Sequence, residues 1–196
     1  MLKKLTPEEF IRFVNPDPSL SLRISMMMAE GVIDFYYIRY PHNQLPKQLM
    51  KQCQDILSSK HINMYGQLYE MELTEHNAVQ FAEDHPFDTI SVQAAQAAKV
   101  ITSVCSVSCY ASEYLVTKPN IYLYNACSYY VAYTVQLATD LIDTESMIAY
   151  LIPEIIDYAI KNEVRMFSGI GDFSKFFDTL SPELKDKVVY NINLFG

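Results

Sequence analysis

The sequence predicts an all-α fold, a single bundle of about seven or eight helices around a central antiparallel helical hairpin. Turn-forming residues are scarce, because the 196 residues include only five glycines and nine prolines. No glycine occurs between Gly66 and Gly169, whereas a β-sheet would need frequent turns over that length. Apolar residues also recur at spacings of three and four, which is the period of a helix with one buried face.

Length and composition favour one folded domain over residues 1–196. Half of the residues are hydrophobic and 19% are charged, which excludes intrinsic disorder for most of the chain and allows a sizeable core. We expect residues 1–162 to form the main bundle and residues 163–196 to form a C-terminal extension packed on it.

The first two predicted helices are separated by a proline. Thr6, Pro7 and Glu9 form a capping box with proline at the first helical position, and this helix ends at Asn15-Pro16. Residues 20–40 then place apolar side chains at helical spacing and predict a long, mostly buried helix.

A turn at residues 40–43 leads to a third helix opened by Pro46, and a fourth helix is predicted beyond Asn63. We expect Thr74 to cap a short continuation of this fourth helix. The sequence His85-Pro86 marks its end, because the residue before proline disfavours the helical conformation.

The central hairpin is predicted over residues 88–141. Asp88 caps a segment to about residue 116 that is rich in Ala and Ser, and such small side chains let neighbouring helices approach closely. Residues 118–120 form a tight break, and residues 121 to about 141 form the antiparallel partner helix.

Thr144 is predicted to cap a further helix that continues to about residue 160 and is kinked at Pro153. Residues 168–174 are the least regular part of the chain, and Ser181-Pro182-Glu183 begins a last helix. Residues 187–192 could instead form a short strand.

Charge is distributed unevenly along the chain. The formal net charge of −8 argues against nucleic-acid binding, which requires basic surface. Residues 62–160 hold twelve acidic residues and only two lysines, Lys99 and Lys118. Most of the acids fall into two groups that flank the predicted hairpin: Glu70, Glu72, Glu75, Glu83, Asp84 and Asp88 before it, and Asp140, Asp143 and Glu145 after it.

The outer ends of an antiparallel hairpin lie together, so the two acidic groups could fall at one end of the bundle. We predict that these nine residues contribute to a docking face for a basic partner, because such fields steer association and specificity. The alternative interpretation is that the acids complement helix dipoles and keep the protein in solution.

No motif in the sequence assigns catalytic residues, a metal or a cofactor. The four histidines never occur at the i, i+4 spacing of a helical zinc site, and Gly-x-Ser-x-Gly is missing. Cys105 and Cys109 do have the i, i+4 spacing of a helical metal site, but buried cysteine commonly acts as a small hydrophobic residue. Residues 167–171 only faintly resemble a phosphate-binding loop, and we interpret them as an ordinary loop.

Tyrosines form two groups at helical spacing: Tyr122, Tyr129 and Tyr133 in one, Tyr110 and Tyr114 in the other. Such tyrosines belong either to the edge of the core or to a contact surface or small ligand pocket.

We expect a cytoplasmic protein. The first ten residues lack the apolar run of a signal peptide, and four cysteines within apolar helical segments are typical of reduced thiols. The longest uncharged stretch, residues 119–139, contains polar residues throughout, so no membrane span is predicted.

The second and third predicted helices contain the sequences Met28-Ala29-Glu30, Val32-Ile33, Tyr40-Pro41, Pro46 and Ile56-Leu57. This pattern resembles an all-α family of immunity proteins from bacterial polymorphic-toxin systems, the fifth numbered immunity class. Later segments rich in Ala, such as residues 92–98 and 126–132, are also similar, and the resemblance covers about residues 20–140.

The resemblance implies a cytosolic protein that binds a cognate toxin, here a basic one, and blocks it by occlusion without acting as an enzyme. One alternative is a helical enzyme or small-ligand receptor with a Tyr-lined pocket. Another is an intracellular or membrane-associated interaction module.

Overall fold

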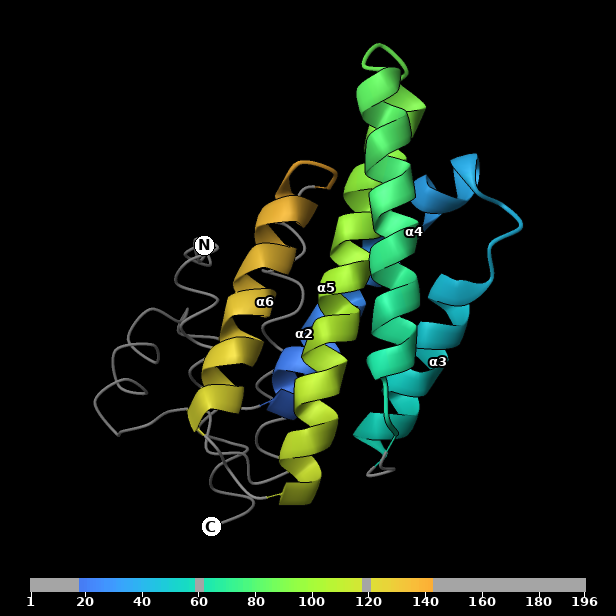
Figure 1. Cartoon of the computed structure of the whole chain (residues 1–196). Helices are drawn as coiled ribbons and strands as arrows, with labels where there is room; N and C mark the ends of the chain where they lie inside the picture. The colour runs from blue at the N-terminus through green and yellow to red at the C-terminus, as the bar shows by residue number, and fades with distance from the viewer. Residues whose placement is uncertain (1–17, 59–61, 118–120, 143–196) are drawn as a thin grey trace, which may run out of the picture.

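A computed structural model describes residues 18–58, 62–117 and 121–142 of the chain. Within these ranges the fold is all-α with no strand, which confirms the predicted fold class (Figure 1). The five helices described are α2 (Pro18–Arg39), α3 (Leu45–Leu57), α4 (Tyr65–Asp84), α5 (Thr89–Thr117) and α6 (Ile121–Thr139). The helices predicted over residues 6–15, 144–160 and 181–195 lie outside the described residues, as do the proposed extension 163–196 and the possible strand 187–192.

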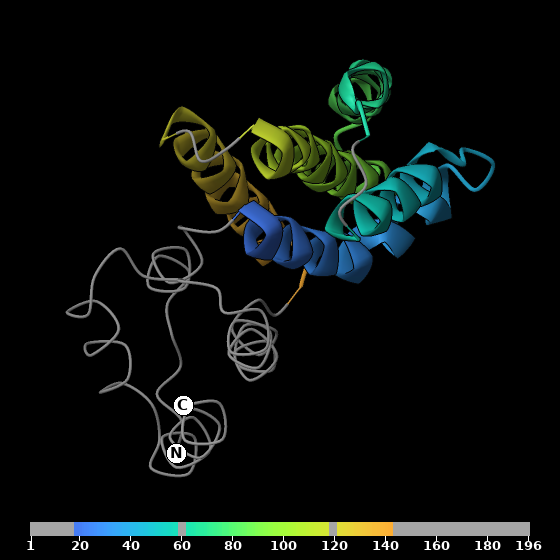
Figure 2. The same cartoon turned by 90° about the horizontal axis from the view of Figure 1, so that it is seen from below.

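Helix α5 occupies the centre of the bundle, as predicted for the first helix of the hairpin. Figure 2 shows α2 and α3 on one side of α5, α4 on the opposite side and α6 alongside it. The most extensive packing joins α5 to α2, α6 and α4, while α6 also packs on α2. Helices α4 and α6 therefore both pack on α5 but pack little on each other.

Small side chains allow α5 to be surrounded in this way. Its Ala94, Ala97, Ala98 and Ala111 are fully buried, so the backbones of its neighbours can come close. The hydroxyls of Thr102, Ser103 and Ser106 are satisfied within α5 itself: they donate to the carbonyl oxygens four residues earlier at 3.0, 2.9 and 3.3 Å. Burial of these polar residues consequently costs no lost hydrogen bond.

Long apolar side chains on α2 fill the space beside α5. Leu22, Ile24, Met28 and Val32 are completely buried, and Tyr36 is almost so. Burial raises the pKa of Tyr36 to about 12, although the amide of Asn43 donates a hydrogen bond to its hydroxyl at 2.8 Å. The Asn43 side-chain oxygen also accepts from the Leu45 N–H at 3.0 Å, so Asn43 ties the turn before α3 to α2.

The four cysteines are buried and free. This agrees with the interpretation of Cys105 and Cys109 as small hydrophobic residues. Burial raises the pKa of Cys53 to about 12, so its thiol stays protonated at neutral pH.

One helix, α4, differs from the sequence-based prediction. Thr74 does not cap a separate segment: α4 runs without interruption from Tyr65 to Asp84, and the Thr74 hydroxyl donates to the Glu70 carbonyl oxygen at 2.8 Å. Threonine inside a helix can also donate to the carbonyl oxygen four residues earlier, so residue type alone does not identify a cap. Helix α6 ends at Thr139, close to the predicted end.

Among the helices described, none combines the length and apolar character that crossing a membrane requires.

Because α5 is central, two isoleucines on this helix should contribute very differently to the free energy of unfolding. Ile101 is 0% exposed and Ile90 is 47% exposed. Replacing Ile101 by alanine should lower the free energy of unfolding by about 2–5 kcal/mol, because the lost contacts leave a cavity. The matched change Ile90→Ala should lower it by about 1 kcal/mol or less. Chemical denaturation measures both values, and equal losses would contradict the central placement of α5.

Candidate protein-interaction surface

Helix α4 is acidic along its solvent side. It carries Glu70, Glu72, Glu75, Glu83 and Asp84 and contains no lysine or arginine. Met71, Ala78 and Ala82 are buried on the opposite side. Glu75 is half-buried and the other four carboxylates are exposed. We call these five residues the acidic face.

Exposed aromatic and aliphatic side chains accompany the acidic face. Tyr65, Tyr69 and Leu73 follow one another at intervals of four residues on α4, and Tyr69 is 70% exposed. Tyrosine is enriched at protein–protein interfaces because it combines a large apolar area with a polar end. Tyr65 and Tyr69 are not among the tyrosines predicted from the sequence to form groups, although their i, i+4 spacing beside glutamates is visible there.

A groove of about 350 Å³ lies between α4 and α6, with α5 as its floor. It exists because both flanking helices pack on α5 and little on each other. The residues that line it are Glu72, Glu75, His76 and Val79 from α4, Lys99, Thr102, Ser103 and Ser106 from α5, and Tyr130 and Tyr133 from α6. Of the two tyrosines in this lining, Tyr133 belongs to a group singled out from the sequence and Tyr130 does not.

Opposite charges line this groove without pairing. Glu72 and Glu75 belong to one wall and Lys99 to the floor, yet the structure records no ion pair between the lysine and either carboxylate. The pKa of Tyr133 is raised, mainly by burial and further by the charge of Glu75. Glu75 and Tyr133 thus influence each other across the groove.

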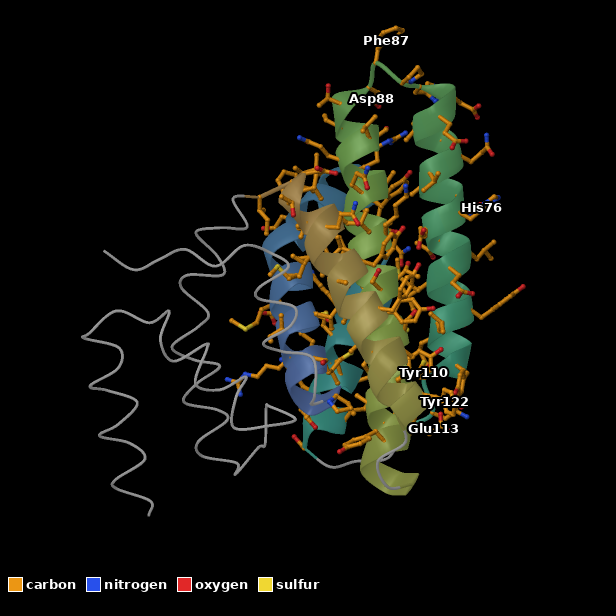
Figure 3. All side chains as sticks on the ribbon, turned by 90° about the vertical axis from the view of Figure 1, so that its left-hand side faces the viewer. His76, Phe87, Asp88, Tyr110, Glu113 and Tyr122 are labelled. Carbon is orange, nitrogen blue, oxygen red and sulfur yellow. The ribbon has the colours of Figure 1, made fainter. Side chains whose placement is uncertain are left out.

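Tyrosine side chains join the three helices at the end of the groove that lies far from the α4–α5 turn. The Tyr65 hydroxyl donates to the Glu113 carboxylate at 3.3 Å and joins α4 to α5. Tyr110 stacks on Tyr130, with ring centroids 5.9 Å apart, and joins α5 to α6. Figure 3 shows Tyr110, Glu113 and Tyr122 gathered at this end.

The two tyrosine groups predicted from the sequence occupy different surroundings. Tyr122, Tyr129 and Tyr133 are exposed on α6, and Tyr129 and Tyr133 stack with centroids 6.5 Å apart. Tyr110 and Tyr114 are half-buried. The α6 tyrosines accordingly belong to the surface, whereas the α5 tyrosines lie at the edge of the core.

The turn between α4 and α5 carries Phe87, whose side chain is 99% exposed (Figure 3). We call this turn the tip of the α4–α5 hairpin, which is distinct from the α5–α6 hairpin predicted from the sequence. The Asp88 N–H donates to the His85 carbonyl oxygen at 2.9 Å and closes the turn. Phe87 was missed in the sequence analysis, although an aromatic residue between Pro86 and Asp88 was a visible anomaly in a polar turn.

Arg39, at the end of α2, contacts residues on both sides of this turn. Its Nε donates to the Ser91 hydroxyl at 3.3 Å, and its guanidinium lies 4.5 Å from the centre of the Phe81 ring. Phe81 in turn stacks on His85 at 4.2 Å. Contacts from three helices therefore hold the turn that carries Phe87.

Asp88 caps α5, as predicted. Its carboxylate accepts from the Ser91 N–H at 3.4 Å and from the Ser91 hydroxyl at 2.6 Å. The hydrogen bond from the Ser91 hydroxyl is the main cause that lowers the pKa of Asp88, and the charge of Arg39 contributes less. Asp88 thus has a structural role in addition to any role in docking.

The structure brings some of the predicted acidic residues to one end of the bundle. Glu83, Asp84 and Asp88 flank the α4–α5 turn in sequence, and α6, which Asp140 follows, ends toward the same end of the bundle (Figure 1). Glu70, Glu72 and Glu75 lie further along α4, away from this turn. Asp143 and Glu145 lie outside the described residues.

Over residues 18–58, 62–117 and 121–142, no group of three His, Cys, Asp or Glu side chains is arranged to hold a metal ion. Comparisons of the chain with protein-family models, with curated proteins and with solved structures find no match.

The capping bonds of Asp88 predict that Asp88→Ala lowers the denaturant midpoint at neutral pH, because alanine cannot accept from Ser91. Asp88→Asn should retain most of the stability, because asparagine caps a helix comparably. Asp84→Ala, which changes an exposed carboxylate on the same side of the turn, is the control and should have little effect.

The lowered pKa of Asp88 also predicts how the difference in stability between wild type and Asp88→Asn changes with pH. A carboxyl whose pKa is lower in the folded than in the unfolded state stabilises the fold above its ordinary pKa, and this stabilisation is lost as the pH falls through the lowered value. The advantage of wild type over Asp88→Asn in denaturant midpoint should therefore shrink in that acidic range. An advantage that does not change with pH would contradict the assigned bonds.

Proposed function

We propose that this chain is an immunity protein of a bacterial polymorphic-toxin system, which binds a basic cognate toxin and neutralises it by occlusion. In this proposal the chain acts in the cytoplasm by binding and not by catalysis. The acidic face of α4 and the tip of the α4–α5 hairpin form the contact surface.

The observation that carries the proposal is the unpaired acidic face. Five carboxylates on α4 have no lysine or arginine on the same helix to neutralise them. A concentrated field of one sign accelerates encounter with a partner of opposite charge and disfavours other partners.

Exposed aromatic residues support the same proposal. Tyr65, Tyr69 and Leu73 provide apolar area next to the carboxylates, and Phe87 projects from a turn held by several contacts. A turn whose backbone is already held by several contacts loses little backbone conformational entropy when a partner covers it. This arrangement suits a tight complex better than the alternative interpretation, in which the acids serve only to keep the protein in solution.

Charge reversal on α4 tests the proposal. The partner is the toxin-like product of a reading frame adjacent to that of this chain, co-expressed and purified with it. Changing Glu70, Glu72 and Glu75 to lysine should slow association by about 10-fold or more and weaken its salt dependence, because steering is electrostatic. Stopped-flow association at several salt concentrations measures both effects.

The matched control for charge reversal is Glu30→Lys with Asp34→Lys. Both residues are exposed on α2, away from α4. The control should leave the association rate close to that of wild type. Failure of the wild-type chain to copurify with the toxin-like product or to rescue growth, or equal rates for both variants, would contradict the proposal.

Truncation of Phe87 tests the tip of the hairpin separately. Phe87→Ala should weaken the complex by about 30-fold, the loss expected when a buried aromatic anchor is removed. The fold should be unaffected, because the side chain is 99% exposed in the free protein. Tyr122→Ala, at the opposite end of the bundle, is the control; titration calorimetry and thermal unfolding provide the measurements. A complex that tolerates Phe87→Ala as well as Tyr122→Ala would exclude the tip from the interface.

A further inference from the structure

We propose that the α4–α6 groove binds a small zwitterion, namely an α-amino acid with an apolar or aromatic side chain. This site does not depend on the proposed function. Glu72 and Glu75 belong both to the groove and to the acidic face, whereas Lys99, Tyr130 and Tyr133 belong to the groove alone. Variants at Lys99 therefore let the two proposals fail separately.

The dimensions of the groove suit a ligand of this size. Its volume of about 350 Å³ is near the lower limit of small-molecule sites, which span roughly 300–1,000 Å³. The hollow exists because the floor consists of small side chains, Thr102, Ser103 and Ser106, whose hydroxyls are folded back onto the α5 backbone. No long side chain of the floor other than Lys99 extends into it.

The charges in the groove favour a ligand with both signs. Glu72 and Glu75 offer carboxylates on the α4 wall, and Lys99 offers an ammonium on the floor. The three groups form no ion pair with one another, so their capacity for charged partners is available to a ligand. An α-amino acid supplies an ammonium for the glutamates and a carboxylate for Lys99. A ligand with a single charge would be attracted by one group and repelled by the other.

The opposite wall supplies aromatic surface for the ligand's side chain. Tyr130 and Tyr133 line the groove, and Val79 adds an aliphatic contact from α4. Their rings are held by neighbours: Tyr110 stacks on Tyr130, and Tyr129 stacks on Tyr133. Rings fixed in advance lose little freedom on binding, which favours an apolar or aromatic ligand side chain.

Calorimetric titration of the full chain with L-phenylalanine, L-tyrosine and L-leucine tests the proposal. Phenethylamine and 3-phenylpropionate are the matched probes, because each retains the aromatic body and one of the two charges. At least one amino acid should bind saturably, and both single-charge probes should bind about 10-fold or more weakly, the loss expected for one charged hydrogen bond. No saturable amino-acid binding at millimolar concentrations, or equal binding of a single-charge probe, would overturn the proposal.

Two single variants locate the site. Lys99→Met should weaken amino-acid binding by about 10-fold without weakening phenethylamine binding, and Glu75→Gln should do so without weakening phenylpropionate binding. Lys51→Met, an exposed lysine on α3, is the control. Circular dichroism verifies folding, and the two variants are independent, so a misfolded one leaves the other informative. Wild-type affinity in both folded variants would place the ligand elsewhere and overturn the assignment.

These variants also separate the two proposals. Lys99→Met should leave association with the toxin-like partner at the wild-type rate, because Lys99 is half-buried on the groove floor and is not part of the acidic face. Loss of amino-acid binding with normal partner association supports the groove as an independent site. Loss of amino-acid binding together with slower partner association would show that the groove belongs to the partner interface and would overturn its assignment as an independent site.

Discussion

The close packing of α5 against α2, α4 and α6 is the contact on which the other features of the bundle depend. Fully buried alanines on α5 let three helices approach one central helix, and the hydroxyls of its Thr102, Ser103 and Ser106 donate to carbonyl oxygens of α5 itself. Replacing such residues by larger ones would separate the helices, because a well-packed core accommodates added volume poorly. The positions of the acidic face, the hairpin tip and the groove all follow from how the outer helices meet α5.

The surface of α4 is a direct consequence of this arrangement. Helix α4 buries Met71, Ala78 and Ala82 and packs Leu68 and Val79 against the core, so its opposite side faces solvent and carries most of the carboxylates and both tyrosines. Arg39 from α2 reaches Ser91 and Phe81, so a helix remote in sequence secures the turn that presents Phe87. Charge and an apolar anchor are thereby combined on one rigid hairpin, which is the basis of the proposed docking function.

The groove has a different origin. Helices α4 and α6 each pack on α5 but little on each other, and the small side chains between them leave the space unfilled. Lys99 and the two glutamates remain unpaired there, although pairing would have neutralised them. The groove therefore combines shape and charges of both signs in a way that neither flanking helix has alone, although it shares Glu72 and Glu75 with the acidic face.

The sequence by itself determined the all-α class, the central place of α5 and the Asp88 cap, since helical periodicity, small residues and capping chemistry act locally. It also indicated that residues 62–160 are acidic. It misplaced a cap at Thr74, because a threonine hydroxyl can also bond to the backbone within a helix, as Thr74 does to Glu70. Only the tertiary structure decided that Arg39 reaches Ser91, that Tyr65 reaches Glu113, and that Lys99 and Tyr133 line one groove. These pairings join residues far apart in the chain, and their proximity depends on the packing of whole helices, which no local pattern encodes.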